Sequence, residues 1–178
     1  MRTVLPIALL VVVALVVFVQ MRPDRFHVER STTINAPSTA IVPHINDFHR
    51  WTAWSPFEKI DPQLQRSYEG PPSGVGAGYH WVGNDKIGEG SMKITESTPS
   101  KVGIDLEFVK PFKASNVATF TLVPAGSGTR VTWAMDGQSN FVSKAMGLFV
   151  SMDDMVGGEF EKGLASLKGI AEGAPGAL

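Results

Sequence analysis

The chain has 178 residues, and its 16 basic and 17 acidic side chains give a formal net charge of −1 at pH 7. This balance removes the electrostatic reason to expect a nucleic acid partner. Cysteine is absent, which excludes zinc fingers and cysteine nucleophiles, and the four histidines His27, His44, His49 and His80 form no H-x-x-x-H pair. We therefore expect neither a metal ion nor a cofactor.

An apolar run opens the chain from Val4 to Met21, interrupted only by Pro6 and Gln20. A helix that rises about 1.5 Å per residue would cross roughly 27 Å of hydrocarbon over this length. A cleaved secretory signal usually has only ~7 to 15 apolar residues and ends in an A-x-A-like site. The run therefore predicts a single-pass membrane anchor with a short linker over residues 1–25, and a cleaved signal is the alternative.

Positive charges flank the run unequally. Arg2 precedes it, whereas Arg22, Arg25 and Arg30 follow it. Because an excess of Lys and Arg normally stays on the cytoplasmic side, the bias favours a cytoplasmic domain. An exported domain can begin in the same way, so the side of the membrane stays open. The sequence carries no signal for the oligomeric state.

Residues 26–172 are sufficient for one globular domain, since about 147 residues can bury a core without disulfides or a structural metal. The last residues, 173–178, read GAPGAL and are expected to form a flexible tail.

The domain opens with a strand pattern of period two from Phe26 to Ile34, which suits the edge of a sheet. One or two short helices are expected between Ser38 and Trp51, and two would be separated at Pro43. The proline-punctuated segment from Trp54 to Asp61 predicts an irregular corner.

Six further runs with a period of two follow, joined by short turn sequences such as PPSGVG and GND. They are Leu64–Glu69, Gly78–Val82, Lys86–Thr95, Val102–Val109, Ser115–Val123 and Thr129–Asp136. Short connections imply that neighbouring strands are antiparallel. From Phe141 to Leu167, apolar residues recur every three or four positions, which predicts one amphipathic helix of some thirty residues. The pair Gly157-Gly158 predicts a kink in it, or a close approach by another element.

This order of elements predicts an α+β helix-grip fold. About seven antiparallel strands form a curved sheet wrapped on the long C-terminal helix, with two short helices after the first strand. One transmembrane helix would precede the domain.

Six sequence blocks carry a resemblance to a known superfamily. They are INAP (34–37), FHRWTAWSPFEKIDP (48–62), YEGPPSGVGAGYHWVGN (68–84), GEGSMKITES (88–97), TRVTWAMDG (129–137) and MDDMVGGEFEKGLASLK (152–168). In them the chain resembles the START-like superfamily called SRPBCC, in particular its polyketide cyclase/dehydrase and lipid-transport branch. The resemblance implies a helix-grip fold with a hydrophobic cavity for lipids, sterols, polyketides or other apolar ligands. It implies a bacterial cytoplasmic membrane for the anchor, and no particular reaction, since some members catalyse and many only bind.

Every second residue along the strands is apolar, and these side chains should face the helix. There they would line a ligand cavity or form a packed core. The predicted cavity residues on the strands are Tyr79, Trp81, Gly88, Gly90, Met92, Leu106, Phe108, Phe120, Trp133 and Met135, and those on the helix are Phe149, Met152 and Met155. Gly88 and Gly90 would leave free volume on this face, which favours the cavity. They could equally mark a bulge or let Trp81 lie over bare backbone. Methionine can adapt to ligands of varied shape.

Two aromatic residues of the irregular corner, Trp54 and Phe57, complete the predicted site. The resemblance places this region near the cavity mouth, which makes them candidates for a gate; a hydrophobic corner that closes the sheet is the alternative.

The sequence assigns no catalytic residue, because no paired carboxylates and no nucleophile with a base are evident. Tyr79 is the one polar side chain expected to face inward from the strands. The expected function is binding of a hydrophobic small molecule or lipid by a membrane-tethered domain. A cyclase or dehydratase type of enzyme and a structural or interaction module with a filled core are the alternatives.

Overall fold

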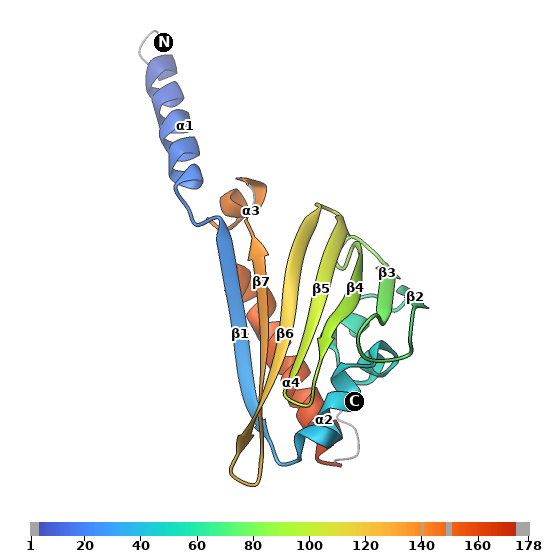
Figure 1. The fold of residues 1–178 in the computed structure, drawn as a ribbon. Coiled ribbons are helices and arrows are strands. Elements are labelled where there is room, and N and C mark those ends of the chain that lie inside the picture. The colour runs from blue at the N-terminus through green and yellow to red at the C-terminus, as the bar shows by residue number, and fades with distance from the viewer. Residues whose placement is uncertain (1–3, 140, 149–150, 174–178) are drawn as a thin grey trace.

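A computed structural model describes residues 4–139, 141–148 and 151–173 of the chain, and its centre is one seven-stranded antiparallel sheet (Figure 1). The strands are β1 (Arg25–Ile34), β2 (Gln65–Glu69), β3 (Gly78–Val82), β4 (Glu89–Ser97), β5 (Lys101–Lys110), β6 (Ala114–Ala125) and β7 (Gly128–Gln138). They lie in the order β1-β7-β6-β5-β4-β3-β2. The connection from β1 to β2 therefore crosses the whole sheet, and every later connection joins neighbouring strands.

Helical segments precede β1, fill this long connection and follow the last strand. They are α1 (Val4–Gln20), α2 (Ser38–Ile45), the 3₁₀ turns η1 (Phe48–Ala53) and η2 (Pro56–Lys59), α3 (Phe141–Met146), the π-helical turn η3 (Asp153–Gly157) and α4 (Gly158–Ala171). In Figure 1, α4 runs behind the sheet, where it packs chiefly against β1. The helix-grip prediction is thereby confirmed: a curved sheet is wrapped around a C-terminal helix.

The predicted strand parity is also confirmed. Side chains of the apolar parity are buried throughout the middle of the sheet, and Ile94, Ile104, Phe120 and Val131 have no exposed surface. The core continues from these strands to α4 through Phe160. Period-two patterning was sufficient in the middle of the sheet because one face of those strands is covered and the other meets solvent.

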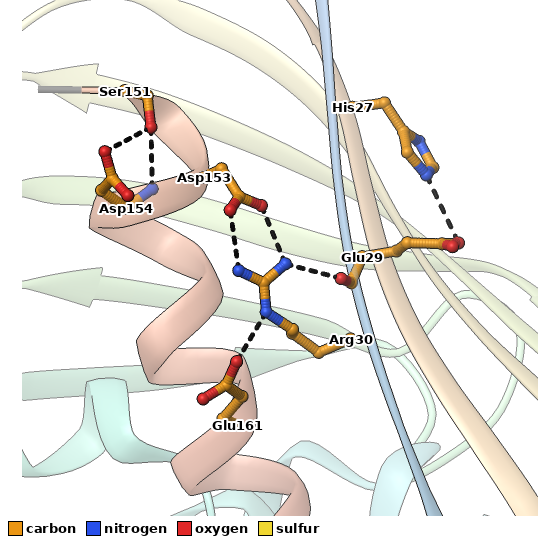
Figure 2. A network of polar contacts seen from close by, with 7 residues as sticks. All are labelled: His27, Glu29, Arg30, Ser151, Asp153, Asp154 and Glu161. Carbon is orange, nitrogen blue, oxygen red and sulfur yellow. Dashed lines mark hydrogen bonds and ion pairs between the residues drawn. The ribbon is translucent and has the colours of Figure 1, made fainter.

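The C-terminal helix differs from its prediction. The single helix of some thirty residues is wrong, because α3 ends at Met146 and Ser151, directly before the helical Met152, is not helical. The Ser151 hydroxyl accepts a hydrogen bond from the backbone N–H of Asp154 at 3.0 Å and donates to its carboxylate at 2.7 Å, as a helix-starting residue does (Figure 2). Met152 continues directly into η3 and α4. The predicted cavity residue Phe149 lies outside the described residues.

A second correction concerns Pro43, which does not separate two helices but lies inside α2. Ile41 and Ile45 on either side have no exposed surface, so burial of this helix outweighs the local preference of proline. The break falls at Asp47, whose carboxylate caps η1 by accepting from the N–H of His49 at 2.9 Å.

An arginine on the edge strand β1 holds the beginning of the C-terminal helix. Arg30 donates two hydrogen bonds of 2.8 Å to the Asp153 carboxylate and one of 2.7 Å to Glu161 (Figure 2). These carboxylates raise the pKa of the guanidinium, and the arginine lowers the pKa of Asp153. A Cβ atom at Gly157 would collide with the guanidinium of Arg30. The close approach expected at the glycine pair is thus confirmed, and it occurs within a π-helical turn.

The first helix leads away from the sheet in Figure 1, and most of its large apolar side chains that the structure describes, such as Leu10 and Phe18, are exposed. Among the described residues, no helix combines the length and the hydropathy that a bilayer crossing requires. The C-terminal end of α1 rests on α3: Val19 is 2% exposed, and the Lys144 ammonium reaches both the carbonyl oxygen of Gln20 and the carboxylate of Asp24.

Candidate functional site

A cavity of about 110 Å³ lies between the inner face of the sheet and the C-terminal helix. Val156 of η3 and Phe160 of α4 form one wall, strands β3 to β7 form another, and the η1–η2 segment with Trp51 closes the third side. On the sheet, α4 packs mainly against β1 and less against β7, and the cavity lies over inward side chains of β3 to β7.

Most of the predicted cavity residues do line this cavity. The structure brings together Phe57, Tyr79, Trp81, Met92, Leu106, Phe108, Trp133 and Met135. They come from η2 and from four strands, and the common feature is the inward parity that the sequence shows on each strand. Phe57, a gate candidate, packs edge-on against Trp133 with ring centroids 6.1 Å apart.

Other predicted members lie elsewhere. Trp54 is 1% exposed, and its indole N–H donates to the carbonyl oxygen of His44 at 2.9 Å, so it is a core residue rather than a gate. Phe120 is fully buried behind the wall, where it stacks on Trp133. Met152 is half-buried against the core and Met155 is 51% exposed, so neither reaches the cavity.

Neither Gly90 of β4 nor Gly88, which precedes this strand, creates the cavity. A side chain at Gly90 would collide with the Trp81 ring and with the carbonyl oxygen of Glu107, so the ring occupies the space that the missing side chain leaves. Gly88 has a φ of +68°, and a Cβ atom there would collide with the Lys110 carbonyl oxygen, next to an irregularity in strand pairing. The structure therefore corrects the reading of free volume and favours the bulge and the bare backbone beneath Trp81.

A buried carboxylate that sequence reasoning missed sits on the same wall. Glu58 of η2 is 9% exposed; its Oε1 accepts from the Tyr79 hydroxyl at 2.6 Å and its Oε2 from Arg66 Nε at 2.5 Å. Burial, followed by the hydrogen bond to this carboxylate, raises the pKa of Tyr79. The same carboxylate raises the pKa of Arg66.

The polar groups around Glu58 already have hydrogen-bond partners. Both oxygens of Glu58 are engaged, and Arg66 also donates to the carbonyl oxygens of Leu64 and Glu58. The second buried carboxylate, Asp61, accepts from the backbone N–H groups of Gln63 and Asn84 and so fixes the adjoining turns. In the part of the chain that the structure describes, no three His, Cys, Asp or Glu side chains gather as metal ligands do.

Glu58 was missed because it lies in a segment without a regular hydrophobic period. The alternation that predicts the direction of side chains on a strand does not apply there. Its sequence neighbours, Pro56 and the ring of Phe57, are the one signal that the segment turns inward. Val156, Phe160 and Ala118, by contrast, belong to the apolar faces that the pattern does predict.

Comparison with known proteins supports this fold. A family model described as polyketide cyclase / dehydrase and lipid transport matches residues 25–172. Among curated proteins, none matches the sequence.

Solved structures with a similar fold come from several bacteria. Protein CV1439 from Chromobacterium violaceum is 13% identical with a TM-score of 0.57, and the match covers 85% of this chain and 99% of that one. A protein from Arthrobacter aurescens is 17% identical with a TM-score of 0.58, over 85% of this chain and 89% of that one. The Mll3558 protein from Rhizobium loti is 16% identical with a TM-score of 0.57, over 79% and 96% of the two chains. At these identities the likeness concerns the fold alone. Because the family model spans most of the sequence and the fold agrees with it, the chain belongs to the polyketide cyclase / dehydrase and lipid transport family.

Proposed function

We propose that this chain binds a hydrophobic small molecule, or the end of a lipid chain, in the cavity between the sheet and the C-terminal helix, and that α1 holds the domain at a membrane. The observation that carries the binding proposal is the cavity wall, which consists almost entirely of aromatic and aliphatic side chains. Apolar cavities of this kind stay dry and take up apolar molecules. The lipid-transport description of the family agrees with this ligand class.

The size of the cavity limits the ligand. An apolar cavity of roughly 150 Å³ is enough for one benzene ring, and here the volume is about 110 Å³. The last carbons of an acyl chain therefore match the present space, whereas a single ring needs small shifts of the side chains that line it. Larger ligands, for which pockets of ~300 to 1,000 Å³ are typical, require side chains to move.

The side chains best able to move are on the β4–β5 side of the wall. Met92, Leu106 and Phe108 are only half-buried, as is Val156 opposite them on η3. Methionine and leucine can change rotamer without breaking hydrogen bonds, so this side offers both an entry route and room for growth of the cavity.

The tethering part of the proposal rests on α1 and on its surroundings. Leu10 and Phe18 are 70% and 57% exposed, and no described residue covers them. Phe26, near the start of β1, pairs with Gly137 of β7, and Gly137 pairs in turn with Asn116, near the start of β6. The turn between β5 and β6 therefore lies at the same end of the sheet as α1 (Figure 1). Phe112 in this turn is 55% exposed. Apolar side chains at one end of the molecule suit contact with a lipid surface.

The orientation proposed is a domain on the cytoplasmic side of a bacterial cytoplasmic membrane. It rests on Arg22 and Arg25, which follow α1 directly, and on the tendency of such charges to remain cytoplasmic. A reporter fused after the last residue tests it, since activity confined to the exported compartment would reverse the orientation.

The binding proposal is tested with the full chain in lipid nanodiscs carrying 5-fluorotryptophan. Three of its four tryptophans, Trp51, Trp81 and Trp133, line the cavity, and Trp54 does not. Toluene titrated into the sample should shift the fluorine resonances of the three lining residues with one common saturation curve. Ala118→Leu, which places extra carbons at the wall, is the matched control and should weaken toluene binding at least fivefold. Resonances that do not respond at saturating toluene would refute the proposal.

A further inference from the structure

Two polar groups in the cavity wall have no hydrogen-bond partner among the residues that the structure describes. They are the hydroxyl of Ser55, which is 1% exposed, and the indole N–H of Trp133, which is 2% exposed. Leaving a buried polar group unpaired costs free energy, so such groups are uncommon in folded proteins. Both of these belong to residues that line one cavity.

The unpaired indole stands out against the other tryptophans. Trp51, Trp54 and Trp81 each donate their N–H to a backbone carbonyl oxygen, at 2.8, 2.9 and 3.3 Å. Trp133 instead stacks with two rings, with Phe160 at 4.1 Å and Phe120 at 4.9 Å between centroids. Both contacts hold the ring in place while its N–H meets no acceptor among the described residues.

Ser55 is unpaired only at its side chain. Its backbone N–H donates to the carbonyl oxygen of Trp51 at 2.8 Å, and its carbonyl oxygen accepts from the N–H of Glu58 at 3.3 Å. The turn is therefore complete without the hydroxyl, which adds nothing to the backbone pairing.

The remaining polar groups on the wall restrict the charge of a ligand. The Glu58 carboxylate is neutralised by Arg66, and the Tyr79 hydroxyl is committed to Glu58. A cationic ligand would compete with Arg66 for its carboxylate, and the described lining residues include no cation to receive a carboxylate ligand. Burial of an unpaired ionic group would be costly.

From these observations we infer that the ligand of the cavity is a neutral, mainly apolar molecule that carries an oxygen acceptor, such as a ketone, aldehyde or ester, and that Trp133 and Ser55 donate hydrogen bonds to this oxygen. An indole N–H can only donate, and a serine hydroxyl can rotate to donate. The inference rests on the proposed binding function and narrows its ligand to carbonyl-type compounds, in place of pure hydrocarbons and free fatty acids.

Two probes of similar shape separate the alternatives in the full chain in nanodiscs. Acetophenone carries a carbonyl oxygen, whereas ethylbenzene has none. Their affinities are compared between the wild type and Ser55→Ala, with the fluorine resonances of Trp51 and Trp81 as the readout. Because each probe is compared with itself, their different partition into lipid cancels. Ser55→Ala should weaken acetophenone about fivefold and leave ethylbenzene within twofold.

Trp133→Phe provides a second, independent test, since phenylalanine keeps a stacked ring but lacks the donor. The variant should lose affinity for both probes, and its loss for acetophenone should be about tenfold greater than its loss for ethylbenzene. If both variants weaken the two probes equally, or leave both unchanged, the two residues only pack, or an ordered water satisfies them, and the inference is overturned while binding stands. If neither probe shifts any resonance in the wild type, the binding function itself fails.

Discussion

Tyr79 on strand β3 donates its hydroxyl hydrogen to Glu58 on the turn η2 at 2.6 Å, and this bond joins the sheet to the segment that closes the cavity. Arg66 of β2 holds the other carboxylate oxygen. The inward tyrosine that the strand pattern predicts is therefore anchored by a charged pair, and the cavity wall beside it is fixed rather than free.

Removal of this bond should destabilise the domain. Tyr79→Phe leaves Glu58 Oε1 without its donor, and an unsatisfied buried acceptor costs ~1 to 3 kcal/mol. Tyr68→Phe is the control, since Tyr68 is 37% exposed and its ring stacks on His49, a contact that phenylalanine preserves; its cost should stay below about 0.5 kcal/mol. Urea unfolding of both variants measures the difference. Equal losses for the two variants would mean that the Tyr79 bond does not stabilise the fold.

Sequence patterns predicted the sheet well because its middle strands have one covered face, whereas they did not predict the break between α3 and the C-terminal helix. The break before Met152 has a sequence signal, since Ser151 and Asp154 form the S-x-x-D pattern of a helix start. The apolar spacing of three or four continues from the residues before it, and this spacing predicted one uninterrupted helix. For Gly90, parity gave the correct face, but no pattern reveals that a neighbouring ring, here Trp81, fills the space.

Two glycines of α4 offer a matched pair for testing how tightly the helix packs. A Cβ at Gly163 would lie 2.8 Å from Trp133 Cζ3 and 3.0 Å from Pro56 Cδ, whereas one at Gly169 would meet nothing within 4 Å. Gly163→Ala should therefore destabilise by ~1 to 3 kcal/mol through overpacking. Gly169→Ala should stabilise by up to about 1 kcal/mol, because alanine favours the helix. Urea unfolding checks both signs, and a stabilising Gly163→Ala would show that the helix is not seated on Trp133.

His27 should make the β1–β7 edge sensitive to pH. Its hydrogen bond to Asp136 at 2.7 Å, assisted by Glu29, raises its pKa above its ordinary value of 6.5. Protonated His27 therefore contributes stability in full below pH 6.5, and this contribution is lost as the pH rises through the raised pKa. NMR titration should show the shift, and Asp136→Asn should lower the pKa. A wild-type value at or below 6.5 would contradict the pairing.

Membrane attachment through α1 predicts a fractionation result. The full chain should remain in the membrane pellet after an alkaline carbonate wash, and a chain lacking residues 1–21 should not. Replacing exposed Leu10 and Val13 by arginine should also release the chain, since each arginine at the centre of an inserted helix costs ~2.5 to 3.5 kcal/mol. The same change at Val82 and Val123, which are exposed on the sheet, should leave it in the pellet. Recovery of a mature protein without its first twenty-odd residues would identify a cleaved signal instead.

The bidentate ion pair between Arg30 and Asp153 should stabilise the start of the C-terminal helix. Arg30→Lys keeps the positive charge but cannot form two parallel hydrogen bonds to one carboxylate while also reaching Glu161. The amides of η3 should then exchange with solvent faster, and the Asp153 pKa should rise toward 3.8, its ordinary value. Lys162→Gln is the control, because Lys162 pairs only along its own helix with Glu159. Since η3 supplies Val156 to the cavity, faster opening here should also speed the exchange of bound toluene. Unchanged amide exchange in Arg30→Lys would show that packing alone positions this turn.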